Sequence, residues 1–143
     1  MKAKDLMIGD WVQCTDPKPF MITDIETEWG TPYFCVTGTD CLAVDGGDLQ
    51  PIPLTAEILK ENGFEEMMNE SEVSAARFGR KPEPTGVWQY GFGQFDSVAY
   101  VPEQSFLRIK FMEGCQADIA NIKYVHELQH ALRLCGVEKE IIL

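Results

Sequence analysis

Turn-forming residues divide the first fifty residues into five short stretches, and this spacing constrains the fold more than any other feature. The stretches at 11–14, 20–26, 33–37, 41–44 and 49–52 are rich in β-branched and aromatic side chains, which favour strands. Glycine, proline and aspartate separate them, and Asp45-Gly46-Gly47-Asp48 is typical of a hairpin turn. Five short strands joined by close turns predict a small closed or half-closed barrel.

The segment Ile8-Gly9-Asp10-Trp11-Val12, which leads into the first strand, resembles the corresponding part of SH3-like barrels. The resemblance implies that residues 1–53 form an SH3-like β-barrel subdomain. Pro51 and Pro53 mark the end of this part of the chain. Because folds of this kind carry many unrelated functions, the resemblance indicates nothing about activity.

Residues 54–64 predict a short helix with signals at both ends. Thr55 can accept a hydrogen bond from a free amide of the first turn, and Glu57 suits the positive end of the helix dipole. Gly63 can adopt the left-handed conformation that follows a helix, and Phe64 can then pack on Leu59. This helix opens a second, α+β subdomain that we expect over residues 54–143.

The remainder of the second subdomain predicts an antiparallel sheet of three to four strands and a C-terminal helix packed on it. Strands are expected at 87–92, 97–101 and 106–111, and in the last of these Arg108 and Lys110 alternate with apolar residues. A helix near 122–135 ends at Gly136, and 137–143 can form a final strand. Residues 65–86 are acidic and then rich in proline and glycine, so we expect them to be irregular or mobile. The two subdomains can also form one compact unit, because the chain has 143 residues.

The charge and the cysteine content indicate which binding partners and which cellular compartment to expect. The formal net charge of −11 argues against nucleic acid, and the local cluster Arg77, Arg80 and Lys81 is expected to be a solvated loop. Five cysteines without a C-x-x-C pair favour reduced thiols: Cys14, Cys35, Cys41, Cys115 and Cys135. Neither a signal peptide nor an apolar run of about 18 residues is visible, so we expect a cytoplasmic protein without a membrane segment.

One motif carries chemistry. His126-Glu127-Leu128-Gln129-His130 matches the H-E-x-x-H pattern, in which two histidines one helical turn apart bind zinc. Glu127 would then act as a base toward the metal-bound water. Zinc binding through His126 and His130 is therefore the alternative to a helix kept for packing.

Several features oppose the zinc interpretation. At 100° per residue, one side of the helix collects apolar residues: Val125, Leu128, Ala131, Leu132 and Cys135. The other side is polar and is expected to face solvent: His126, Gln129, His130 and Arg133. A catalytic zinc helix must instead turn its ligands toward a walled cleft, and the sequence offers no evident third ligand. We expect no metal and no cofactor, and we expect Cys135 to be buried and inert.

Both ends of the chain resemble one family of small proteins from anaerobic gut bacteria and their phages or mobile elements. The resemblance is carried by Leu6–Val12, by residues 51–64 and by Ile122–Gln129. Members of that family often read H-x-L-Q-N, which implies that the zinc-like match in this chain is a local coincidence. No activity is established for the family, so the resemblance assigns no functional residue.

Three functions follow as hypotheses. The first is a non-catalytic accessory protein of a phage or mobile element that binds another protein or itself. The alternative is a zinc-dependent hydrolase built on His126, Glu127 and His130. The third is a nucleic-acid-binding module that uses the barrel and the cluster of Arg77, Arg80 and Lys81. The lack of a second catalytic motif favours the first, non-enzymatic function.

Overall fold

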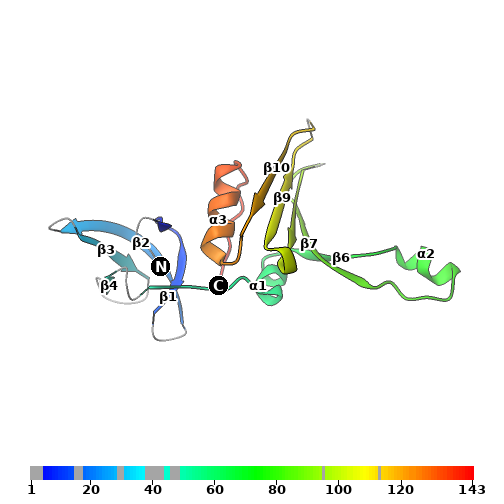
Figure 1. The fold of residues 1–143 in the computed structure, drawn as a ribbon, viewed down its shortest axis with the longest axis horizontal. Coiled ribbons are helices and arrows are strands. Elements are labelled where there is room, and N and C mark those ends of the chain that lie inside the picture. The colour runs from blue at the N-terminus through cyan, green and yellow to red at the C-terminus, as the bar shows by residue number, and fades with distance from the viewer. Residues whose placement is uncertain are drawn as a thin grey trace. The chain divides into compact units, whose positions relative to one another are not determined.

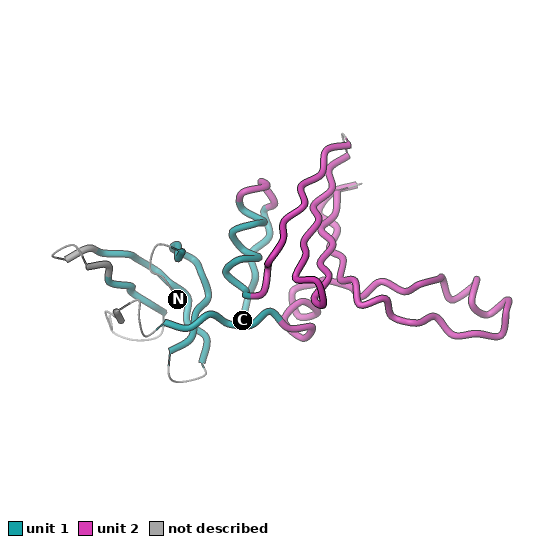
Figure 2. Tube along the Cα trace, in the orientation of Figure 1, with its two compact units in different colours: residues 1–54, 124–133, 138–143 teal, residues 55–123, 134–137 magenta. Residues whose placement is uncertain are grey.

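The structure, a computed structural model, describes residues 5–14, 18–28, 31–37, 44–45, 49–94, 96–112 and 114–143. The chain folds into two compact units (Figure 2). Unit 1 comprises residues 1–54, 124–133 and 138–143, and unit 2 comprises residues 55–123 and 134–137. The first segment of unit 1 ends at residue 54, and the predicted first subdomain ends at residue 53. The sequence did not predict that residues 124–133 and 138–143 belong to unit 1.

Unit 1 contains an antiparallel sheet whose strand order is β4-β3-β2-β1-β5. Its strands are β1 (Trp11–Gln13), β2 (Pro19–Glu28), β3 (Thr31–Val36), β4 (Val44–Asp45) and β5 (Gln50–Pro51). Strands are therefore present at four of the five predicted stretches. The stretch predicted at 41–44 lies outside the described residues except for Val44, with which β4 begins. Among the described residues no pairing joins β4 to β5, so the sheet is not a closed barrel. The SH3-like barrel stays a prediction.

The long strand β2 holds the sheet of unit 1 together. Its first part pairs with β1, and its second part pairs with β3 after a register shift between Ile22 and Asp24. The alternation of apolar side chains along the strands then builds one core, whose buried members are Leu6, Val12, Ile22, Phe34, Val36 and Leu49.

The C-terminal helix α3 (Val125–Leu134) confirms the helix predicted near 122–135. The backbone N–H of Val125 donates to the carbonyl of Ile52, and Tyr124 forms a bridge with Pro53. After the helix, the indole N–H of Trp11 donates to the carbonyl of Ile141 at 2.7 Å. The predicted strand at 137–143 is wrong, because this segment forms no strand ladder.

Unit 2 contains an antiparallel sheet whose strand order is β10-β9-β8-β7-β6. Its helices and strands are α1 (Ala56–Glu61), β6 (Glu65–Met68), α2 (Glu72–Arg77), β7 (Pro84–Gly91), β8 (Ser97–Val101), a short 3-10 helix (Pro102–Gln104), β9 (Phe106–Lys110) and β10 (Gln116–Ala120). The strands predicted at 87–92, 97–101 and 106–111 are confirmed, whereas β6 and β10 at the two edges were not predicted. The fold is α+β.

Helix α1 forms as its sequence predicts. The Thr55 side chain accepts a hydrogen bond from the N–H of Ile58, and Gly63 follows with a φ of 79°. The N–H of Phe64 then donates to the carbonyl of Leu59, and both side chains are buried. The cap and the closing contact therefore fix where the helix begins and ends.

The segment 65–86 is not irregular, because it contains β6, α2 and the start of β7, whereas the mobility expected for it stays a prediction. Strand β6 pairs with β7, and Ser71 caps α2 by accepting a hydrogen bond from the N–H of Ser74. Two further bonds close the strands on each other, from Asn69 N–H to the Glu83 carbonyl and from the Thr85 hydroxyl to the Met67 carbonyl. Within unit 2 these residues form an arm that carries α2 at its far end (Figure 1).

Candidate functional site

Helix α3 carries the H-E-x-x-H motif, but its polar side is not solvated as predicted. His126 is 5% exposed and Gln129 is 3% exposed. The segment before β1 covers this side. The side-chain NH2 group of Gln129 donates to the carbonyl of Gly9 at 3.1 Å, and the backbone N–H of Trp11 donates to the side-chain oxygen of Gln129 at 3.4 Å. The helical wheel separated the two sides of α3 correctly, yet periodicity cannot show that a loop about 120 residues earlier covers the polar one.

Asp10 is the centre of the polar cluster beneath that loop. Its carboxylate is fully buried and lies 2.8 Å from Nε2 of His130, and it accepts a hydrogen bond of 2.7 Å from Met7 N–H. The guanidinium of Arg133 approaches the same carboxylate to 3.5 Å. A buried charge requires such partners, and the carboxylate of Asp10 has them. The cluster therefore connects the loop to α3, and both belong to unit 1.

His126 lies next to this cluster without joining it. Its ring stacks on Tyr124 and meets the ring of His130 edge to face, with centroids 5.9 Å apart in both pairs. The buried Nδ1 atom has no hydrogen-bond partner among the described residues. Burial lowers the pKa of His126, while the nearby charge of Asp10 acts in the opposite direction. Burial therefore favours the neutral form of the His126 ring.

The motif does not arrange its residues as a zinc helix does. The Glu127 carboxylate accepts the N–H of Tyr124 at 3.1 Å and so caps the start of α3. His130 directs Nε2 to Asp10 rather than to an open position. No group of three or more potential ligands suited to a metal ion occurs among the described residues. The zinc-dependent hydrolase accordingly stays a hypothesis without structural support.

The other residues singled out from the sequence are dispersed. Arg77, Arg80 and Lys81 are all exposed, at the end of α2 and just after it. Phe78 lies among them, with the Arg80 guanidinium 5.3 Å from the centre of its ring. The four described cysteines are thiols, and Cys135 is partly exposed rather than buried as predicted.

The best-formed candidate surface lies on the sheet of unit 2. Along β8 and β9 one face is fully buried, by Val98, Tyr100, Leu107 and Ile109. The opposite face, called here the open face, is only partly covered and carries Val87, Gln89, Ser97, Ala99, Val101, Phe106, Arg108 and Lys110. Alternation in β9 predicted which side Arg108 and Lys110 take. It did not predict that apolar residues share that side.

These residues, together with Met67, line a hollow of about 300 Å³ on the open face. Its floor is mostly apolar, and the charged side chains that line it are the cations Arg108 and Lys110. Arg108 forms a paired contact with Asp118 of β10 at 2.8 Å, which raises the pKa of Arg108 and lowers that of Asp118. The hollow thus offers both apolar area and fixed positive charge.

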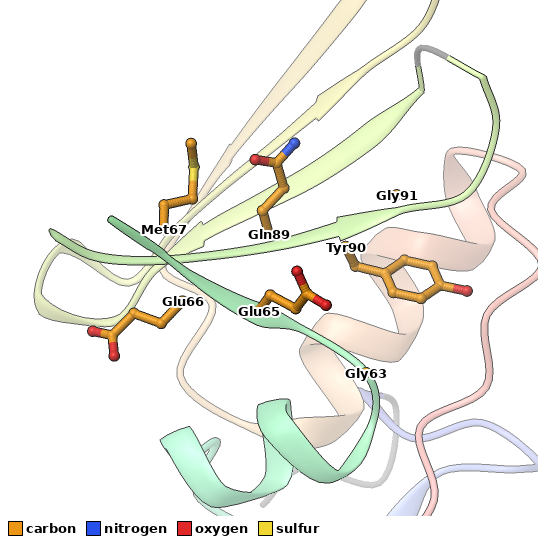
Figure 3. Close-up of a pocket in the computed structure, with 7 residues that line it drawn as sticks. All are labelled: Gly63, Glu65, Glu66, Met67, Gln89, Tyr90 and Gly91. Atoms are coloured by element: carbon orange, nitrogen blue, oxygen red, sulfur yellow. The ribbon is translucent and has the colours of Figure 1, made fainter. Parts of the chain in front are cut away.

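A second hollow of about 500 Å³ adjoins the first at the β6 edge of the sheet. Figure 3 shows Met67 and Gln89, which line both hollows, on the same side of the strands, whereas Glu66 points to the other side. The register pairs Glu65 with Gln89 across β6 and β7, which places Glu65 on the open face. One carboxylate therefore borders the open face on each edge strand, Glu65 on β6 and Asp118 on β10.

No family model, curated protein or solved structure matches this chain. Nothing in these comparisons bears on the resemblance to the family of small phage-associated proteins. None of the helices in the part of the chain that the structure describes has the length and apolar character of a membrane span.

Proposed function

We infer that this protein is a non-catalytic interaction protein that binds a protein partner on the open face of unit 2. The observation that carries the proposal is the hollow of about 300 Å³ on a sheet face whose apolar side chains are only partly covered. Solvated sheet faces usually alternate polar side chains outward, and here Val87, Val101 and Phe106 take outward positions. Partly exposed apolar area rimmed by charge is typical of protein interaction sites.

The chemistry of the two candidate sites favours binding over catalysis. In the polar cluster, the carboxylate of Asp10 is paired with His130, and the carboxylate of Glu127 caps α3. The open face offers no histidine, cysteine or carboxylate among the residues that line its hollow. Such a surface can hold a side chain or a short segment of a partner.

We further propose that the protein is an accessory protein of a phage or mobile element that acts in the cytoplasm. The resemblance of both ends of the chain supports the first part of this proposal. The odd number of cysteines and the lack of a C-x-x-C pair support the second, because a disulfide framework favours an even count.

A photo-crosslinking amino acid at Ser97, on the open face, tests the proposed binding. A matched protein carries the same group at Lys18, an exposed position of unit 1. After irradiation in the native host, we expect a protein adduct from position 97 that is absent at position 18. Equal yields from the two positions, or no adduct from position 97, would contradict the proposal.

A further inference from the structure

The tip of the arm, here residues 74–82, holds three cations and no carboxylate. Arg77, Arg80 and Lys81 lie within five residues, and the rest of the sequence has no second group of cations as dense as this one. All three are exposed, and neither Arg77 nor Lys81 forms an ion pair with a described residue. Arg80 lies 3.4 Å from Glu70, but its side chain is 62% exposed, and such surface pairs are weak. The arm tip is therefore locally positive on a chain of net charge −11.

Phe78 lies among these cations with 70% of its surface exposed. The guanidinium of Arg80 is 5.3 Å from the centre of the ring, so a cation already accompanies the ring. Leaving a large aromatic side chain in water is unfavourable, and an exposed one on an ordered element often marks a contact site. The arm tip thus presents a flat aromatic surface and positive charge together.

The backbone fixes the positions of Phe78 and Arg80. Helix α2 ends in a Schellman motif, in which the N–H of Gly79 donates to the carbonyl of Ala76 at 3.1 Å. The N–H of Arg80 donates to the carbonyl of Ala75 at 3.0 Å, and Gly79 takes the left-handed conformation of the motif with a φ of 64°. The ring and the charges are thus ordered before a partner binds, which lowers the entropic cost of binding.

The arrangement of apolar side chains indicates the class of partner. Val73, the other large apolar residue exposed on α2, lies five positions before Phe78. At about 100° per residue the two side chains point about 140° apart, so they do not form one apolar face. A helix that enters a protein groove or a membrane surface needs such a face. A single flat ring among cations instead suits stacking on a nucleobase, with the cations beside phosphates.

The acidic remainder of the chain is separated from the arm tip. Helix α2 lies at the far end of the arm (Figure 1). Four residues of strand, the length of β6, span about 13 Å. Exposed charges more than about 8 Å apart are largely screened at physiological ionic strength. Within the arm, Glu72 lies in the first turn of α2, at the opposite end of the helix from Arg77. An anionic ligand can therefore approach the tip.

We propose that the arm tip binds single-stranded nucleic acid, with the ring of Phe78 stacked on a base and the three cations beside the phosphates. The site is separate from the open face, and it uses no residue of unit 1. The base must be unpaired, because the bases of a duplex already stack on each other and leave no face for the ring. Stacking and phosphate contacts do not read base edges, so we expect little sequence preference.

Titration of the full chain against labelled oligonucleotides tests the inference. Fluorescence anisotropy should detect binding to single strands of about 15 thymidine or uridine nucleotides at about 50 mM salt, and weaker binding to a duplex with the same number of phosphates. Three neutralised phosphates predict a slope of about −2 for the logarithm of the association constant against that of the salt concentration. Raising the salt to about 200 mM should therefore weaken binding by about twentyfold.

Variants of the tip separate stacking from charge. Phe78→Ala removes the ring and should weaken binding by about tenfold while the salt slope stays unchanged. Arg77→Gln combined with Lys81→Gln should instead reduce the magnitude of the slope by about 1.4. The matched controls are Met112→Ala, at an apolar position that is 65% exposed, and Lys18→Gln, at an exposed cation of unit 1. Both controls should bind like the unaltered chain. Because every altered side chain is exposed, circular dichroism should show the same fold throughout.

Several results would overturn the inference. Flat titrations with both oligonucleotides at low salt exclude the site. Equal binding of single strand and duplex, or unchanged binding by Phe78→Ala, would show that charge alone accounts for the affinity and that the ring does not stack. Binding to vesicles that contain an anionic phospholipid, without binding to either oligonucleotide, would assign the tip to a membrane surface instead. The crosslinking experiment at position 97 is independent of all these results, because it reports on the open face.

Discussion

The Nε2 atom of His130 lies 2.8 Å from one carboxylate oxygen of Asp10 and 2.9 Å from the other. The two residues are 120 positions apart in the sequence. Through this pair the loop before β1 holds α3, so a helix near the C-terminus belongs to the unit built by the first fifty residues. The motif that suggested a metal centre thus helps to connect α3 to the loop before β1.

Asp10→Ala should destabilise unit 1 strongly. The change removes the carboxylate and leaves buried groups without their partner, which costs about 3 kcal/mol when one member of a buried pair is deleted. Urea unfolding followed by tryptophan fluorescence measures the change. Glu26→Ala removes an exposed carboxylate from β2 and should change the free energy of unfolding by less than about 0.5 kcal/mol. Equal stability of the two variants would show that the Asp10 cluster contributes nothing.

Much of the fold was predictable because local patterns agree with it. Turn residues and β-branched or aromatic stretches identified strands of unit 1, alternation identified three strands of unit 2, and Thr55 and Gly63 marked the ends of α1. These signals depend on neighbours in sequence, which set the local backbone conformation.

The remainder depended on contacts that sequence periodicity does not report. Strand β6 lies at a sheet edge and has few buried side chains. Because it begins with Glu65 and Glu66, its sequence looks like that of an acidic loop. The polar side of α3 read as solvated because nothing local shows that Gly9 and Trp11 bind Gln129. The open face was missed for a related reason: a hollow forms only when β6 to β9 lie side by side.

His126 makes the stability of unit 1 dependent on pH. Burial lowers its pKa below the ordinary value of 6.5 in the folded chain, against the opposing charges of Asp10, Glu127 and Asp5. Between the two pKa values the unfolded chain binds a proton that the folded chain does not. Stability is therefore full above about pH 6.5 and falls as the pH drops toward the folded pKa. Urea midpoints measured between pH 7.5 and 5.5, a range of about two units around that value, should decrease.

The variant His126→Phe isolates this contribution, because it keeps a ring between Tyr124 and His130 but cannot bind a proton. Its stability should fall less steeply between the same two pH values. A proton NMR titration of the imidazole of His126 gives an independent reading. A pKa at or above 6.5 in the folded chain, or identical slopes for both proteins, would contradict this account.

Metal removal should leave the protein unchanged. Asp10 and Tyr124 already engage His130 and Glu127, so a zinc ion would have to displace contacts that stabilise α3. We expect elemental analysis of protein purified without added metal to find no stoichiometric zinc. Thermal unfolding with and without a chelator should then superimpose, because a structural metal would add its binding energy to folding. Zinc at one equivalent with a lower melting temperature after chelation would restore the hydrolase hypothesis.

The arm should respond to its cap locally. Ser71 accepts the N–H of Ser74 at the start of α2, and replacing such a cap with alanine costs about 1 kcal/mol. Ser71→Ala should therefore speed amide hydrogen exchange within residues 72–78 while exchange in β8 and β9 stays unchanged, since α2 lies at the far end of the arm (Figure 1). Ser71→Asp is the matched control, because aspartate caps as well as serine and should keep the slow exchange. Equal protection of α2 in both variants would mean that the Ser71 cap does not stabilise the helix. The cap would then not be what orders Val73 and Phe78.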